Sequence, residues 1–230
     1  MRINYGSKAL ALIPVNGVVG QLLRFLLPQL YQVGINSMWF RTFAYPENKL
    51  GFVSFTRKPS ELNVLHVGKY SYSATSIDAT HVKNDVKISI GRYTSIGRNL
   101  KIITSGGHLP ESISVYPILE SNQYDRGDVK IGNDVWIGDD VTVLGNSTVG
   151  DGCVIGTKSL VSGHLDDFGI FGGIPAKLIR YRFDESRRRM LSESSWWKLD
   201  LNDLKAICKD LSMDDVDGFL SRLHEMLQSK

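Results

Sequence analysis

One histidine stands in a setting that suits acid–base chemistry. His108 lies in a glycine-rich stretch at residues 105–110 (Ser-Gly-Gly-His-Leu-Pro), and Ser-Val-Tyr-Pro follows at residues 114–117. An imidazole has an unperturbed pKa of about 6.5, so a histidine on a loop can take up a proton at neutral pH. The residue type therefore predicts a general base. The alternative is a histidine that only pins its loop through hydrogen bonds.

The remaining histidines are His66, His81, His164 and His224. We expect His66 to precede the repeat described below, His81 to lie in its weakest part, and His224 to lie on a helix surface. His164 falls in the last repeat, where it either caps a turn or approaches a bound ligand. No pair of histidines or cysteines has the spacing of a metal site, so the sequence predicts no metal.

The element that positions these residues is a repeat with a period of six. Every sixth residue from 131 to 161 is aliphatic: Ile131, Ile137, Val143, Val149, Ile155 and Val161. Four of them precede a glycine, and compact residues lie four places after the first five: Val135, Val141, Ser147, Cys153 and Ser159. A helix repeats near 3.6 residues and a half-buried strand near 2. The period therefore indicates a parallel β-helix, with aliphatic layers inside and glycine at the corners.

The repeat is interrupted in its middle. It begins near Val67 and becomes clear at Ile90, Ile96 and Ile102, but the pattern is absent from residue 104 to residue 128. Long insertions in compact repeats are usually functional and lie on a binding face. We therefore divide the chain into an N-terminal extension at 1–60, a β-helix domain at 61–183 with the loop 104–128, and a helical region at 184–230.

Composition narrows the choice of function and compartment. A net charge of +3 and a pI near 8.8 are too small a basic excess to indicate nucleic-acid binding. Cys153, at an inward repeat position, and Cys208, in a helical pattern, predict a reducing, cytoplasmic compartment without disulfides. The apolar run at 9–27 is interrupted too often to span a membrane. We interpret segment 18–30 as a short amphipathic helix on the end of the prism, with weak attachment to a membrane surface as the alternative.

Several motifs resemble those of the hexapeptide-repeat acyltransferases. They are Ile-Gly-Asn-Asp-Val-Trp-Ile-Gly at 131–138, Ile-Gly-Thr-Lys-Ser at 155–159 and Gly-Gly-Ile-Pro-Ala-Lys-Leu-Ile-Arg at 172–180. The sequence is most similar to the xenobiotic acetyltransferase branch: type B chloramphenicol acetyltransferases, streptogramin acetyltransferases and related polysaccharide O-acetyltransferases. His108 with residues 114–117 matches the branch motif His-(x)n-Ser-Thr-Tyr-Pro, with Val115 in the threonine place. The resemblance covers roughly residues 65–220 and includes the start of the first coil and the Trp196-Trp197 tail.

The resemblance implies a left-handed β-helix and a homotrimer with active sites between adjacent prisms. It also implies acetyl-CoA as co-substrate and His108 as the general base. The residues that it implies for acetyl-CoA binding are Trp136 and Asp139 beside the thioester and pantetheine, Thr157 on the pantetheine arm, Ser162 near the nucleotide, and Lys177 and Arg180 on the phosphates. Gly163 stands where the family often has lysine, and we assign Lys158 to compensate for that loss.

The predicted function is acetyl-CoA-dependent O-acetylation of a sugar or polysaccharide precursor, because the apolar N-terminal extension favours chemistry near a membrane. A drug-inactivating acetyltransferase for chloramphenicol or a streptogramin is the alternative acceptor class. From other classes we consider a zinc-dependent carbonic anhydrase of γ type, which needs three clustered histidines, and a non-catalytic β-helix that serves as a binding or assembly module. A zinc determination separates the first of these from an acetyltransferase.

Overall fold

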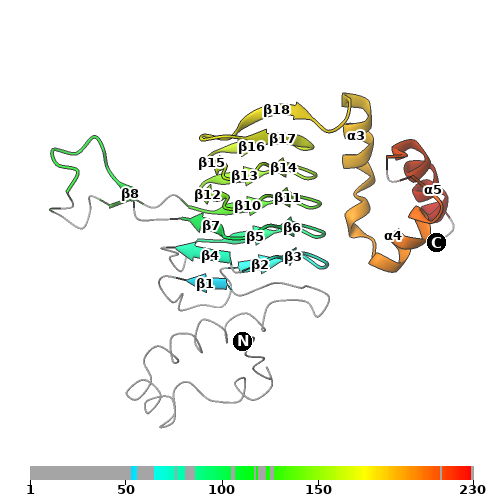
Figure 1. The fold of residues 1–230 in the computed structure, drawn as a ribbon, viewed down its shortest axis with the longest axis horizontal. Helices are drawn as coiled ribbons and strands as arrows, with labels where there is room; N and C mark the ends of the chain where they lie inside the picture. Colours follow the sequence, from blue (N-terminus) through cyan, green and yellow to red (C-terminus); the bar gives the residue numbers. More distant parts are fainter. Residues whose placement is uncertain are drawn as a thin grey trace, which may run out of the picture.

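The chain winds into a three-sided prism, and each coil contributes one short strand to each face (Figure 1). The computed structural model describes residues 53–55, 65–75, 77–80, 86–104, 107–116, 118, 123–124, 127–212 and 214–228. Within this part of the chain, strands on the same face pair in parallel from coil to coil, and only β18 runs antiparallel on the prism. The predicted all-β solenoid, a left-handed parallel β-helix followed by C-terminal helices, is confirmed.

We number the faces in the order in which the chain visits them from residue 65 onwards. The first face holds β2 (Leu65–Val67), β5 (Ile88–Ile90), β10 (Val129–Ile131), β13 (Ser147–Val149) and β16 (His164–Leu165). The second face holds β3 (Tyr72–Ser73), β6 (Ser95–Ile96), β11 (Trp136–Ile137), β14 (Val154–Ile155), β17 (Gly169–Gly172) and β18 (Lys177–Tyr181). The third face holds β1 (Val53–Phe55), β4 (Ile77–Thr80), β7 (Leu100–Ile103), β12 (Thr142–Leu144) and β15 (Leu160–Val161).

The interior of the prism contains the layers that the repeat predicts. All six aliphatic residues of the period are at most 1% exposed, and the five compact residues that follow them are at most 2% exposed. Cys153 is among these buried residues, and both cysteines of the chain are free thiols. Burying each aliphatic side chain stabilises the fold by about 1.5–3 kcal/mol. Because a coil buries these side chains only against its neighbours, the stacking of coils holds the structure.

The third face starts before the predicted domain boundary. Strand β1, at Val53–Phe55, pairs in parallel with β4. The sheet therefore extends into the segment 1–60 that the sequence assigned to an N-terminal extension. The amphipathic helix expected at 18–30 lies outside the described residues. His66, expected to precede the prism, instead lies on strand β2 with its side chain exposed.

Side chains clamp the two coils that flank the insertion. At each of the three corners, an Asp or Asn side chain of the coil after the insertion accepts a hydrogen bond from a backbone N–H of the coil before it. The two residues of each pair are 41 positions apart. The pairs are Lys87 N to Asp128 (2.8 Å), Arg92 N to Asn133 (2.8 Å) and Arg98 N to Asp139 (2.7 Å). These bonds satisfy corner amides that no strand partner reaches, and they keep the coils in register across the insertion.

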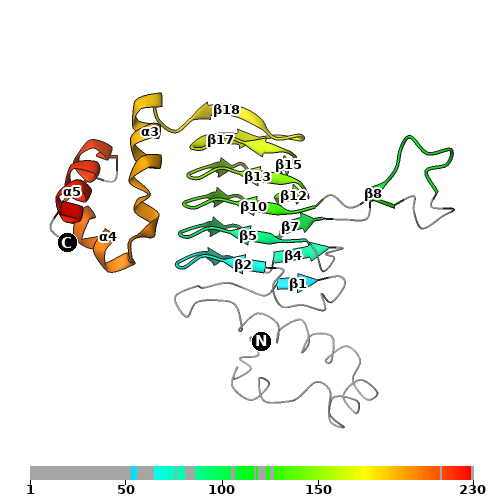
Figure 2. The same cartoon turned by 180° about the vertical axis from the view of Figure 1, so that it is seen from behind.

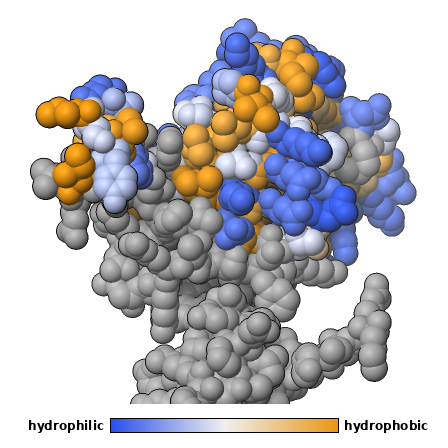
Figure 3. Space-filling view, turned by 60° about the vertical axis from the view of Figure 1, so that its left-hand side comes forward, coloured by the Kyte–Doolittle hydropathy of each residue, from blue (hydrophilic) through white to orange (hydrophobic). Residues whose placement is uncertain are grey.

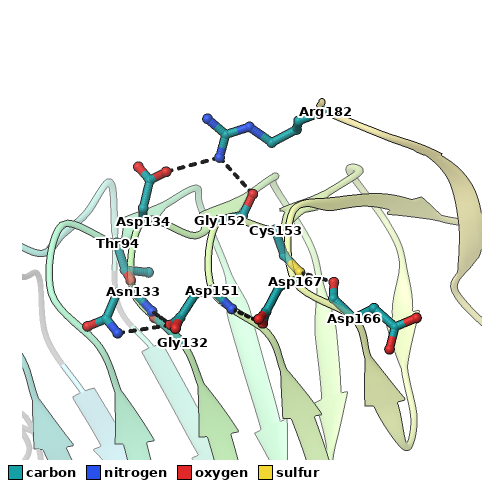
Figure 4. A network of polar contacts seen from close by, with 10 residues as sticks. All are labelled: Thr94, Gly132, Asn133, Asp134, Asp151, Gly152, Cys153, Asp166, Asp167 and Arg182. Carbon is teal, nitrogen blue, oxygen red and sulfur yellow. Dashed lines mark hydrogen bonds and ion pairs between the residues drawn. The ribbon is translucent and has the colours of Figure 1, made fainter. Parts of the chain in front are cut away.

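The corner between the first and second faces continues this ladder (Figure 4). Asn133 N donates to Asp151 at 2.6 Å, and Asp151 N donates to Asp167 at 2.8 Å. Beside the ladder, Arg182 donates to Asp134 at 3.0 Å and to the carbonyl of Gly152 at 2.7 Å. Burial raises the pKa of the Asp134 carboxyl above its ordinary value, and the Arg182 charge opposes that shift. This corner is therefore a structural seam.

Three helices and a short 3-10 turn pack on the same corner, on the side of the prism opposite strand β8 (Figures 1 and 2). They are α3 (Glu185–Ser194), η3 (Trp196–Lys198), α4 (Leu201–Cys208) and α5 (Val216–Gln228). Asp184 caps α3 by accepting a hydrogen bond from Arg187 N at 2.9 Å. Tyr93 packs against Trp196 and donates to the Leu199 carbonyl at 2.9 Å, and burial raises the pKa of its phenol to about 12.

Candidate active site

His108 stands on an arm that leaves the prism at the corner between the third and first faces. The arm contains a two-stranded antiparallel pair, β8 (Gly107–His108) with β9 (Gln123–Tyr124), and it projects away from the prism (Figures 1 and 2). Its base is closed by a hydrogen bond from Gly127 N to the Thr104 carbonyl at 3.2 Å. The described residues of the insertion predicted at 104–128 therefore include a projecting arm, and Thr104 and Gly127 join at its base.

The arm carries several exposed apolar side chains (Figure 3). The exposed apolar residues on it are Leu109, Ile113, Val115, Tyr116 and Ile118. Ile113 is fully exposed, and Tyr116 is 72% exposed. Large apolar side chains gathered on a projecting segment usually mark a surface that binds a partner or a ligand.

The geometry of the His108 side chain fixes which nitrogen can act as a base. Its Nδ1 lies 2.6 Å from the carbonyl oxygen of Val115. A carbonyl can only accept a hydrogen bond, so Nδ1 carries the proton and donates it. The lone pair of the neutral imidazole then resides on Nε2, on an exposed ring. The arrangement gives the tautomer that a general base acting through Nε2 requires.

Trp136 and Arg180 share one row on the outside of the second face. The register runs from Ser95 through Trp136, Val154 and Ile170 to Arg180 on five neighbouring strands. The Trp136 side chain is 60% exposed, and Arg180 is also exposed. Three strand spacings separate the two residues, a distance of about 14 Å. An indole and a guanidinium at this separation can contact different parts of one extended ligand.

The adjoining corner, between the second and third faces, gathers the other predicted residues. Asp139 and Thr157 occupy the same corner position in consecutive coils, and Lys158 follows Thr157 with a left-handed φ of 62°. Lys177 pairs with Gly172, and Gly172 in turn lies over Gly156, the corner glycine of the previous coil. Thr157, Lys158 and Lys177 are exposed. One edge of the prism therefore presents two amines and a hydroxyl to solvent.

Asp139 differs from its neighbours because its carboxylate already has partners within the chain. One oxygen accepts from Arg98 N at 2.7 Å, and the other accepts from Arg98 Nε at 2.9 Å and Nη2 at 2.7 Å. These bonds to Arg98 hold the pKa of the Asp139 carboxyl below its usual value. The structure thus gives Asp139 a place in the corner clamp, which the sequence did not indicate because Arg98 lies 41 residues earlier.

The predicted residues do not converge within one chain. Trp136, Asp139, Thr157, Lys158, Lys177 and Arg180 lie on the second face and its edge with the third face. His108 projects from the corner between the third and first faces, and Ser162 follows β15 at that same corner. In a triangular prism that corner lies opposite the second face. The body of the prism therefore separates His108 from Trp136.

Comparison with known proteins decides the family. Residues 128–163 match the bacterial transferase hexapeptide (six repeats) model. A chloramphenicol acetyltransferase of Agrobacterium fabrum is 37% identical over 165 residues, which cover 62% of this chain and 79% of the relative. The chain is a hexapeptide-repeat acetyltransferase of the xenobiotic branch. The predicted family, the assignment as an enzyme and acetyl-CoA as co-substrate are confirmed, which sets aside a non-catalytic module.

More distant proteins are similar to this acetyltransferase in part of the sequence or in the fold. The galactoside O-acetyltransferase of Escherichia coli K12 is 25% identical over 116 residues, which cover 50% of this chain and 53% of the relative. A Vibrio cholerae hexapeptide-repeat acetyltransferase, solved with acetyl coenzyme A, has the same fold with a TM-score of 0.50. It is 18% identical over 75% of this chain and 93% of its own length.

Other candidate features of the acetyltransferase are placed away from this edge. Nε2 of His164, on β16, lies 3.3 Å from a carboxylate oxygen of Asp166, beside a hollow of about 470 Å³ that Tyr181 and Arg188 also line. His224 lies exposed on α5, and His81 is outside the described residues. Among the described residues, no three His, Cys, Asp or Glu side chains are placed to hold a metal ion. None of the described helices is long and apolar enough to cross a membrane.

Proposed function

We propose that this acetyltransferase transfers the acetyl group of acetyl-CoA to a hydroxyl, with His108 as the general base. The observation that carries the proposal is the hydrogen bond from His108 Nδ1 to the Val115 carbonyl, at 2.6 Å. It holds the ring in the tautomer that keeps Nε2 unprotonated. A hydroxyl is a weak nucleophile at neutral pH and needs such a base.

In the proposed reaction, Nε2 of His108 takes the hydroxyl proton as the acceptor oxygen attacks the thioester carbonyl. Backbone N–H groups at a coil corner stabilise the oxyanion that develops. The new carbon–oxygen bond forms, the carbon–sulfur bond breaks, and the imidazolium returns its proton to the leaving sulfur. Atoms and charge balance without any further reactant.

The second face and its edge supply the groups that we propose for acetyl-CoA. Trp136 offers an exposed aromatic surface to the pantetheine arm, beside Thr157 and the clamped carboxylate of Asp139. Cations are suited to the phosphates. Within the described part of the chain, Lys158, Lys177 and Arg180 are exposed and form no ion pair with a carboxylate. For the nucleotide we propose a contact with Ser162, which lies at the corner between the third and first faces.

We further propose that the active site is completed between copies in a homotrimer. Within one chain the prism separates His108 from Trp136, so a site that contains both needs the arm of one copy and the second face of another. Both surfaces carry exposed apolar side chains, notably Tyr116 on the arm and Tyr72 with Trp136 on the second face. The same proposal keeps the division into an extension at 1–60, a β-helix at 61–183 and helices from 184, with strand β1 at the end of the extension paired to the β-helix.

For the acceptor, we propose a sugar hydroxyl in a glycan precursor. The apolar character of the extension and the likeness to a galactoside O-acetyltransferase support this choice. Chloramphenicol is the second candidate, because the relative with 37% identity is a chloramphenicol acetyltransferase. In either case the arm residues around His108 form one wall of the acceptor pocket.

An acetyl-CoA thiol-release assay tests the function. The acceptor panel contains chloramphenicol, a streptogramin A, free sugars and nucleotide-linked sugars. We expect turnover on a sugar, with the acetyl ester located by mass spectrometry. Turnover on a drug alone would replace the sugar proposal by the second candidate. An acetylated amine instead of a hydroxyl would contradict O-acetylation.

A further inference from the structure

The group that orients His108 is itself oriented by another side chain. The carbonyl of Val115 and the N–H of Tyr116 belong to the same peptide unit, which is planar. The carbonyl accepts from His108 Nδ1 at 2.6 Å, and the Tyr116 N–H donates to Ser114 Oγ at 3.2 Å. The two groups of a trans peptide point in opposite directions. An acceptor that holds the N–H therefore also sets the direction of the carbonyl.

The Ser114 hydroxyl that contacts this peptide is partly shielded from water. Val115 and Tyr116 are both exposed, so water competes for their backbone groups, whereas the Ser114 side chain is half-buried. A peptide whose N–H is hydrogen-bonded is polarised, which makes its carbonyl a better acceptor. The Ser114 hydroxyl thus both directs and strengthens the carbonyl that holds the His108 proton on Nδ1.

We propose that Ser114 is a positioning residue, whose hydroxyl keeps His108 in the tautomer with Nε2 free to act as the base. The inference rests on the proposed role of His108. A second serine provides a matched control, because Ser112 Oγ lies 2.7 Å from both the Leu109 and the Ser114 carbonyl oxygens. It braces the same turn through these two carbonyls, which belong to other peptide units than the one between Val115 and Tyr116.

The test compares Ser114→Ala, Ser114→Thr and Ser112→Ala in the full chain labelled with ¹⁵N-histidine. The imidazole ¹⁵N shifts report the tautomer, and the spectrum of His108→Ala identifies the His108 signals among the five histidines. We expect Ser114→Ala to give a mixture of tautomers and a kcat lower by roughly five- to tenfold, with the KM for acetyl-CoA unchanged. Ser114→Thr keeps the hydroxyl and is expected to restore both the tautomer and kcat.

The control variant and the activity assay separate the possible failures. Ser112→Ala is expected to keep the single Nδ1–H tautomer of the wild type. A single tautomer in Ser114→Ala, or the same mixture in Ser112→Ala, would overturn the role assigned to Ser114. Full activity of His108→Ala would instead overturn the proposed function, whatever the tautomer of the serine variants.

Discussion

Replacing His108 by alanine is expected to lower kcat by about 10²–10⁴-fold, the usual contribution of a positioned general base. The side chain is exposed on the arm, and its hydrogen bond is to the Val115 carbonyl, so its loss leaves the prism layers intact. Binding of acetyl-CoA is expected to change little, because none of the proposed contacts with acetyl-CoA uses the His108 side chain. Steady-state kinetics and calorimetric titration with CoA measure the two effects separately.

The control for this variant is His164→Ala. His164 is also exposed, but it lies on strand β16 of the first face and contacts Asp166. Its replacement is expected to leave kcat within about twofold of the wild type. Undiminished turnover in His108→Ala would rule out the proposed base. A loss of CoA binding equal to the loss of turnover would show that His108 acts in binding.

The second large effect is expected in the corner glycines, and it concerns stability. A Cβ added at Gly91 would lie 2.5 Å from the carbonyl carbon and oxygen of Gly132 in the next coil. Both contacts are with backbone, which cannot move aside without separating the coils. We expect Gly91→Ala to lower the free energy of unfolding by about 3 kcal/mol. Urea unfolding at a fixed protomer concentration measures the change.

Gly156 offers a matched comparison at the same place in the six-residue motif. A Cβ there would meet the Phe171 carbonyl oxygen at 3.4 Å, which is an ordinary contact. Gly156→Ala is expected to change the free energy of unfolding by less than about 1 kcal/mol. Equal effects of the two substitutions would show that close approach of the coils is not what requires glycine at Gly91.

The layers of the β-helix were predictable because the six-residue spacing that defines each layer is visible within a short stretch of sequence. The spacing of Ile131, Ile137 and Val143 places all three inside the prism, whatever the rest of the chain does. The arm was equally visible as a break in that spacing. Its chemistry was less so, because the partner of His108 is the carbonyl of Val115, and every residue has a carbonyl.

Contacts between coils could not be predicted in the same way. The clamp between Arg98 and Asp139 spans 41 residues, and its register depends on where the insertion ends. The separation of His108 from Trp136 was hidden for a related reason. It follows from which corner carries the arm, and a one-dimensional period does not number the corners. The resemblance to a family implied a site between copies, and the separation of His108 from Trp136 across the described prism supports that proposal.

Mixed assemblies test this central claim most directly. One chain carries His108→Ala, and the other carries Lys177→Glu with Arg180→Glu, which places negative charge where we propose that the CoA phosphates bind. Each variant alone is expected to be nearly inactive when acetyl-CoA is well below the wild-type KM. The two chains are co-expressed with different tags, and the mixed trimers are purified through both.

In randomly mixed trimers, about a quarter of the sites combine an intact arm from one chain with an intact second face from its neighbour. We therefore expect unfractionated co-expressed protein to recover about a quarter of wild-type activity, and the doubly purified trimers to recover more. Separately assembled variants mixed afterwards serve as the control and are expected to stay inactive. Co-expressed chains no more active than that control would contradict a site shared between copies.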